Sequence, residues 1–131
     1  MKRILFVCVE NSNRSQMAEA FANIHGVGAV EAHSAGSRPS GRVNPKAVES
    51  MREVGYDLST HKSKGLDLFN GQVFDVAVTM GCGDECPLVQ ADHRLEWQIP
   101  DPKALDPEHF REVRNLIESK VVEMIRAIIA R

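Results

Sequence analysis

The sequence lacks three features that assign many proteins to a class: an excess of basic residues, a long apolar segment and a dense set of cysteines. Its 16 Lys and Arg residues are balanced by 18 Asp and Glu. The chain therefore lacks the excess of basic residues that is typical of nucleic-acid-binding proteins. The longest apolar run, Ile4 to Val9, is far below the ~20 residues that a membrane-spanning helix needs. The run also lacks the length and cleavage site of a signal peptide, so we expect a cytoplasmic protein.

Cysteine is scarce, with only three in 131 residues. In a reducing compartment these are not expected to form a structural disulfide framework. The residues that are present, 43% hydrophobic and 26% charged, have the composition of an ordinary globular domain. No repeat, low-complexity tract or long linker divides the chain, so we predict one domain over residues 1–131.

Four short apolar segments have the pattern of buried strands. The first, residues 2–8, becomes continuously apolar after two basic residues, which is typical of a strand covered on both faces. The others are predicted at residues 29–35, 74–80 and 95–99. Amphipathic helical segments are interspersed with them, so we predict βαβ crossovers and a mostly parallel sheet.

Caps and glycines mark the predicted helix boundaries. Apolar residues at helical spacing between positions 17 and 22 predict a first helix that ends at a glycine, position 26. Asn44-Pro45 and Asp106-Pro107 each place an N-cap before a proline and begin the next two helices. The second helix is predicted to close at Gly55. In a parallel sheet ligands bind beyond the carboxyl ends of the strands, so the residues there are candidates for a site.

The segment from Cys8 to Ser15 lies between the first predicted strand and helix. A loop there turns successive N–H groups toward one point, with the positive end of the helix behind them, which makes an anion site. The guanidinium of Arg14 can bind two oxygens of a tetrahedral oxyanion. The same surroundings favour the nucleophilic thiolate of Cys8, to which the Ser15 hydroxyl can donate. The predicted oxyanion-binding residues are Val9, Glu10, Asn11, Ser12, Asn13, Arg14 and Ser15. The alternative is an ordinary core cysteine beside a surface arginine.

This segment resembles the phosphate-binding loop of the low-molecular-weight protein tyrosine phosphatases. It is more similar still to the thioredoxin-coupled arsenate reductases built on that fold, whose usual pattern is C-x-x-N-S-x-R-S-Q-M-A-E. The likeness continues through residues 33–36 and the Asp-Pro pair to the last helix. It implies a flavodoxin-like three-layer α/β/α sandwich with a four-stranded parallel sheet of order 2-1-3-4. Two residues depart from the pattern: Glu10 stands where glycine is common, and Asn13 where cysteine is common. Glu10 would weaken oxyanion affinity if its side chain turned inward.

The resemblance assigns the three cysteines to a redox relay. Cys82 and Cys86 follow the third predicted strand, which would neighbour the first strand in a flavodoxin-like sheet. Reduction of arsenate to arsenite takes two electrons, which two thiols release when they form a disulfide. In the implied relay Cys8 attacks arsenate, Cys82 resolves the adduct, and Cys86 moves the disulfide to an exposed position. The implied substrate is arsenate, with phosphate or sulfate as analogues. Thioredoxin is the expected electron donor, glutaredoxin or another small thiol system is the alternative, and no cofactor is implied.

A zinc site is the alternative for the second and third cysteines. Cys82 and Cys86 have the spacing of half a zinc site, with His93 as a third candidate, but a closed site needs four ligands and no second pair is evident.

Some members of the family hold potassium near the loop. The residues that match its ligand positions are Asn11, Glu19 and Ser34. Lys62 and Lys64 stand where oxygen ligands would be expected, so we predict no bound potassium and no other metal.

The departing oxygen needs a proton, and two Asp-Pro pairs compete to supply it. Asp106 is explained as a helix N-cap. Asp101 directly follows the last predicted strand and matches the general-acid position of the family, so we predict that Asp101 is the acid. The alternative is a purely structural role, in which Asp101 only starts a turn. The resemblance also suggests that His61 supports the loop through Asn11.

Two other functions use the same residues. A phosphotyrosine phosphatase would need only Cys8, Arg14 and Asp101. However, the phosphatases usually carry tyrosines after the Asp-Pro, where this chain has Lys103-Ala104, and residues 37–42 contain no aromatic residue to hold a phenol ring. A non-enzymatic redox or oxyanion sensor would need the thiols and the loop without turnover. We predict an arsenate reductase, which we expect to be a monomer that retains weak phosphatase activity.

Overall fold

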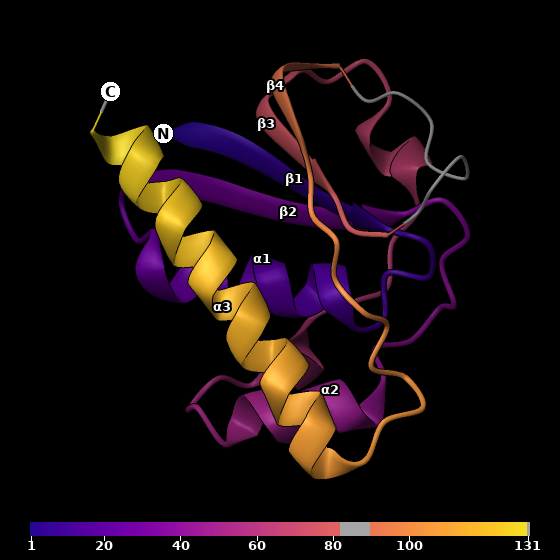
Figure 1. The fold of residues 1–131 in the computed structure, drawn as a ribbon. Coiled ribbons are helices and arrows are strands. Elements are labelled where there is room, and N and C mark those ends of the chain that lie inside the picture. Colours follow the sequence, from indigo (N-terminus) through magenta and orange to yellow (C-terminus); the bar gives the residue numbers. More distant parts are fainter. Residues whose placement is uncertain (82–89, 131) are drawn as a thin grey trace.

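A four-stranded parallel sheet organises the chain, in the order β2-β1-β3-β4 (Figure 1). The structure is a computed structural model that describes residues 1–81 and 90–130. The strands are β1 (Lys2–Cys8), β2 (Val30–Gly36), β3 (Phe74–Thr79) and β4 (Ala91–Glu96). The helices are α1 (Arg14–His25), α2 (Pro45–Arg52) and α3 (Pro107–Ile129), with short 3-10 helices η1 (Leu58–Thr60) and η2 (Leu66–Phe69). The predicted flavodoxin-like class and strand order are confirmed.

The central strand β1 sends its side chains alternately into two apolar cores. Ile4 and Phe6 are fully buried in the larger core, together with residues of α1 and α3. Leu5 and Val7 point to the opposite face and pack in a second cluster with Phe74. Burial on both faces explains why the sequence of this strand is continuously apolar.

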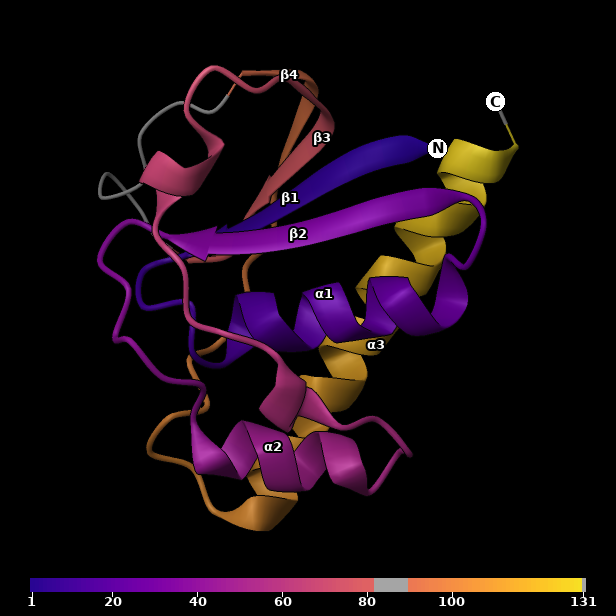
Figure 2. The same ribbon diagram turned by 180° about the vertical axis from the view of Figure 1, so that it is seen from behind.

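The three α-helices lie on the same side of the sheet (Figures 1 and 2). Helix α1 packs against β1, β2 and α3, while α2 packs against α3 farther from the sheet. On the opposite face, η2 contributes Leu66 and Phe69 to the second cluster. None of the helices in the described part of the chain combines the length and the apolar character needed to cross a membrane.

The predicted helix caps are confirmed. The Asn44 side chain accepts a hydrogen bond from the N–H of Lys46 at 2.9 Å, and Asp106 accepts one from the N–H of His109 at 2.9 Å. Each satisfies an N–H group that has no partner within its helix, and the following proline provides no N–H that needs one.

Two predicted boundaries are wrong. The second helix ends at Arg52 and not near Gly55, which adopts a φ of 86° in the turn that follows. The last strand covers Ala91–Glu96 and not residues 95–99. As an edge strand β4 leaves most of its side chains exposed, so the apolar signal came instead from Trp97 and Ile99, which are buried after the strand has ended.

Candidate active site

The loop after β1 is held by the backbone of residues 37–44. Carbonyl oxygens of the loop accept hydrogen bonds from N–H groups of that segment: Val9 at 2.8 Å, Glu10 at 3.0 Å and Ser12 at 3.0 Å. Because the C=O and N–H of one peptide unit point in opposite directions, the N–H groups that follow these carbonyls face away from this segment. The loop therefore turns donors toward its inner side, as an anion site requires.

Asn11 fixes the direction of the hydrogen bonds that end at Cys8. Its φ of 51° is in the left-handed region that asparagine tolerates better than most residues. Its Oδ1 accepts from Gln16 Nε2 at 2.9 Å and from the Lys64 N–H at 2.7 Å. Its Nδ2 then donates to Ser15 Oγ at 2.8 Å. The Ser15 hydroxyl hydrogen is left to donate to Cys8 Sγ, 2.9 Å away, where it stabilises a thiolate.

The same chain of hydrogen bonds continues behind the loop to His61 and Tyr56. Gln16 Nε2 already donates to Asn11, so Gln16 Oε1 accepts from His61 Nδ1 at 3.0 Å. His61 Nε2 then accepts from the Tyr56 hydroxyl at 2.6 Å. Burial is the main cause that lowers the pKa of His61, which favours the neutral ring that this arrangement needs. His61 thus reaches Asn11 through Gln16, a link that the sequence did not reveal.

Arg14 is buried at the start of α1 and faces Asp101. Its Nη1 donates to the Ile99 carbonyl at 3.1 Å, and its Nη2 lies 3.9 Å from Asp101 Oδ2. Gly81 makes room for this guanidinium, because a Cβ at that position would lie 2.3 Å from Arg14 Nη1. The sequence signal for this role is a glycine that follows a buried strand.

These side chains surround a cavity of about 360 Å³. Its lining residues are Cys8, Val9, Glu10, Ser12, Asn13, Arg14, Gly81 and Asp101. Cys8 and Arg14 are buried, whereas Glu10 and Asp101 are more exposed, so the nucleophile and the guanidinium lie deeper than the two carboxylates. Asn11 and Ser15 are absent from this lining and act from behind the loop.

The positive end of α1 opens toward this cavity. Asn13 precedes the helix, and no side chain in the described part of the protein caps its first N–H groups. The Asn13 Oδ1 atom is buried and has no hydrogen-bond partner among the described residues. Uncapped N–H groups at a helix N-terminus favour an anion there.

The predicted resolving cysteines, Cys82 and Cys86, lie outside the described residues. His93, the third candidate for a zinc site, lies exposed on β4. Among residues 1–81 and 90–130 no group of three or more His, Cys, Asp and Glu side chains could hold a metal ion.

A positive charge lies beside the residues that match potassium-ligand positions. The Lys64 ammonium lies 3.7 Å from Glu19 Oε1, which also accepts a hydrogen bond from Ser34. A positive charge is therefore already present beside the carboxylate, and a second cation would be repelled.

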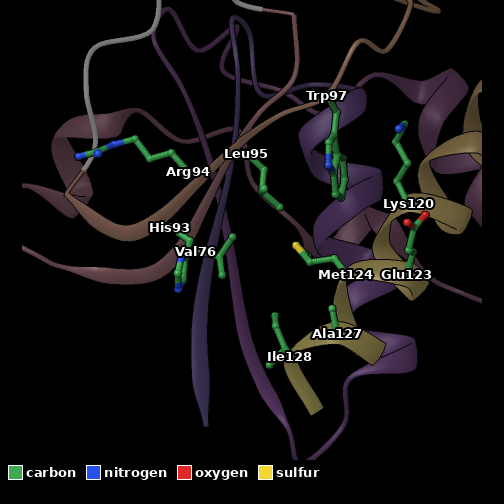
Figure 3. A pocket seen from close by; sticks show the side chains of 10 residues that line it. All are labelled: Val76, His93, Arg94, Leu95, Trp97, Lys120, Glu123, Met124, Ala127 and Ile128. Carbon is green, nitrogen blue, oxygen red and sulfur yellow. The ribbon is translucent and has the colours of Figure 1, made fainter. Parts of the chain in front are cut away.

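A separate hollow of about 400 Å³ lies between β4 and α3 (Figure 3). Trp97 and Leu95 face Met124 and Ile128 across it. The Trp97 ring centre lies 6.0 Å from that of Phe6, so this tryptophan packs on the core. Its described lining includes none of the loop residues and no cysteine or serine.

Comparisons with known proteins agree with this geometry. The profile of the family described as low molecular weight phosphotyrosine protein phosphatase matches residues 3–131. A Synechocystis protein named glutaredoxin arsenate reductase is 39% identical over 131 residues, covering 98% of this chain and 99% of that protein. The solved structure of an arsenate reductase in the phosphate binding state has a TM-score of 0.89 at 38% identity, covering 98% of this chain and 99% of that one. A thioredoxin-dependent arsenate reductase from Corynebacterium glutamicum has a TM-score of 0.80 at 32% identity, covering 99% of this chain and 63% of its own.

Proposed function

The chain belongs to the low molecular weight phosphotyrosine protein phosphatase family, and we propose that within this family it is an arsenate reductase that works through a relay of three cysteines. The observation that carries the proposal is a buried cysteine beside Arg14 in an anion-type loop, in a chain whose full-length relatives are named arsenate reductases. Arsenate is a tetrahedral oxyanion, which is the shape that this loop suits.

The first step joins Cys8 to arsenic. The Cys8 thiolate attacks arsenate, and a hydroxyl oxygen leaves as water after it has received a proton. Asp101, at the edge of the same cavity, supplies that proton. Arg14 and the loop N–H groups bind the remaining oxygens and stabilise the charge that develops on them.

The second step transfers the electrons. The thiolate of Cys82 attacks the sulfur of Cys8, and the electron pair of the sulfur–arsenic bond stays on arsenic. Arsenate is thereby reduced to arsenite, and a Cys8–Cys82 disulfide forms. Cys86 then attacks Cys82, which frees Cys8 and leaves a Cys82–Cys86 disulfide for a dithiol protein to reduce.

We propose thioredoxin as the electron donor. A structural relative is described as thioredoxin-dependent, which supports this choice. Glutaredoxin is the second candidate, because a relative that matches this chain almost from end to end is named a glutaredoxin arsenate reductase. A thioredoxin provides two thiols that reduce the final disulfide directly, whereas a glutaredoxin works with glutathione.

The experiment follows NADPH oxidation on addition of arsenate, with either the thioredoxin or the glutaredoxin–glutathione system as donor. We expect turnover with thioredoxin, and none in Cys8→Ser, Cys82→Ser or Cys86→Ser variants. Glu49→Gln, an exposed change on α2, serves as the control and should retain full activity. Turnover only with glutaredoxin would overturn the proposal that thioredoxin is the donor. Absence of turnover with both systems would overturn the proposal that the protein is an arsenate reductase.

A phosphatase is the second candidate function, because the family description and the cavity of Cys8, Arg14 and Asp101 both fit it. Residues 37–42 offer no aromatic side chain to hold a phenol ring. We therefore expect slow hydrolysis of small aryl phosphates. A rate of hydrolysis above the rate of arsenate reduction would indicate that the protein is a phosphatase.

A further inference from the structure

We propose that Glu10 and Lys103 form a gate at the mouth of the cavity, which admits free tetrahedral oxyanions and disfavours their esters. The inference deepens the proposed function, since it rests on the loop being an oxyanion site. The gate is an ion pair: Lys103 Nζ lies 3.2 Å and 3.4 Å from the two carboxylate oxygens of Glu10.

The ion pair joins the two segments that carry the reactive groups. Glu10 lies two residues after Cys8 in the loop, and Lys103 lies two residues after Asp101. Glu10 and Asp101 both line the cavity, so the contact ties one wall to the other.

Burial places this contact at the outer rim. Cys8 is 2% exposed and Arg14 9% exposed, whereas the side chains of Lys103 and Glu10 are 60% and 40% exposed. An oxyanion on Cys8 therefore lies deeper than the Glu10 carboxylate, which lines the same cavity, and a group attached to that oxyanion would extend toward this rim.

Lys103 also fixes the position of the predicted acid. Its backbone N–H donates to Asp101 Oδ1 at 3.0 Å, and its carbonyl accepts from Lys46 Nζ of α2 at 3.1 Å. The segment that bears Asp101 is thus held by Lys46 of α2 on one side and by Glu10 across the cavity on the other.

The ion pair reduces the repulsion that the Glu10 carboxylate would exert on an anion in the cavity. The Glu10 carboxylate is turned to the Lys103 ammonium, which offsets its charge beside the cavity. Loss of the ammonium should weaken oxyanion binding, and neutralising Glu10 should strengthen it. An ester must in addition displace the contact between Glu10 and Lys103. Removing either charge should therefore improve the binding of esters relative to that of free oxyanions. Because exposed ion pairs are weak, we expect about two- to fivefold changes.

The test measures how phosphate and phenylphosphonate protect Cys8 from alkylation, with modification of the Cys8 peptide quantified by mass spectrometry. Phenylphosphonate is a non-hydrolysable stand-in for a phosphate ester. The variants are Glu10→Gln, Lys103→Met and the double variant, which keep side-chain size while they remove the charges. Glu49→Gln, which affects an ion pair on the surface of α2, is the matched control.

We expect each single variant to lower the ratio of the phenylphosphonate Kd to the phosphate Kd by about two- to fivefold. The phosphate Kd itself should fall in Glu10→Gln and rise in Lys103→Met. The double variant should lower the ratio no further than either single variant, because one contact is lost in all three. High salt should lower the ratio in the wild-type protein only.

An unchanged ratio, or additive effects in the double variant, would overturn the gate. Failure of phosphate to protect wild-type Cys8 would also overturn it, because the loop would then bind no free oxyanion. None of these measurements needs arsenate turnover, so a protein that gated phosphonate but did not reduce arsenate would contradict only the proposed function.

Discussion

The hydroxyl of Ser15 lies 2.9 Å from the sulfur of Cys8, and Asn11 directs its hydrogen there by donating to the same oxygen. This contact joins the first turn of α1 to the end of β1, where both side chains are buried. The reactivity of Cys8 in the proposed mechanism depends on it.

Ser15→Ala should slow the alkylation of Cys8 at neutral pH by about tenfold or more, because a hydrogen bond to a charged group is lost. Iodoacetamide labelling followed on the Cys8 peptide measures this rate. Ser119→Ala, on the exposed side of α3, is the control. A rate equal to that of the wild type would mean that Ser15 does not stabilise the thiolate.

Substitution of Asn11 separates its backbone conformation from its hydrogen bonds. Asn11→Gly and Asn11→Ala both lose the donor to Ser15, but only alanine is strained at a φ of 51°. We expect the alanine variant to be less stable than the glycine variant by about 1 kcal/mol in urea unfolding. Both should slow the alkylation of Cys8 to the same degree. Equal stability of the two variants would show that the left-handed conformation does not matter.

Gly81→Ala should displace the guanidinium of Arg14. Gly81 has a φ of 80°, and its added Cβ would lie 2.3 Å from Arg14 Nη1. Gly71→Ala is a matched control, because Gly71 has a φ of 78° but no atom within 4 Å of its added Cβ. Both variants should lose about 1 kcal/mol of stability, and only Gly81→Ala should bind phosphate at least about tenfold more weakly. Similar phosphate affinity in the two variants would contradict the position of Arg14.

Glu53 should stabilise the contact between α2 and α3 in a pH-dependent way. The hydrogen bond from Arg111 is the main cause that lowers the pKa of Glu53 from 4.5 to about 2, and Arg114 adds to it. Because the pKa is lower in the folded protein, the stabilisation is complete above 4.5 and is lost as the pH falls toward about 2. The stability difference between wild type and Glu53→Gln should therefore shrink as the pH falls through this range. For Glu49→Gln, whose partner Arg52 is as exposed as Glu49, the difference should stay small throughout.

Local sequence patterns were sufficient for much of the fold and for the centre of the site. β1, the loop and α1 follow one another without interruption, so Cys8, Arg14 and Ser15 could be placed together from their spacing. The parallel sheet followed from alternating strands and helices, and its order from the family resemblance. The position of β4 was missed because an edge strand with exposed polar side chains has no apolar pattern.

Contacts between distant residues could not be predicted from local sequence patterns alone. Glu10 and Lys103 are 93 residues apart, and His61 is 45 residues from Gln16. No spacing rule relates such positions, since only the tertiary fold brings them together. Asp101 was predicted as the acid, with a turn-starting role as the alternative. It also accepts the hydrogen bond from the Lys103 N–H, so its carboxylate is held in place as well as aimed at the cavity.

The central claim is that two electrons pass from cysteine sulfur to arsenic within one chain. The most direct test mixes fully reduced protein with excess arsenate in the absence of any external reductant. Remaining thiols are then alkylated and the disulfides are identified by mass spectrometry. The account predicts one arsenite released per chain and a Cys82–Cys86 disulfide, with Cys8 free to be alkylated. Three free thiols, together with hydrolysis of an aryl phosphate under the same conditions, would contradict it and indicate a phosphatase instead.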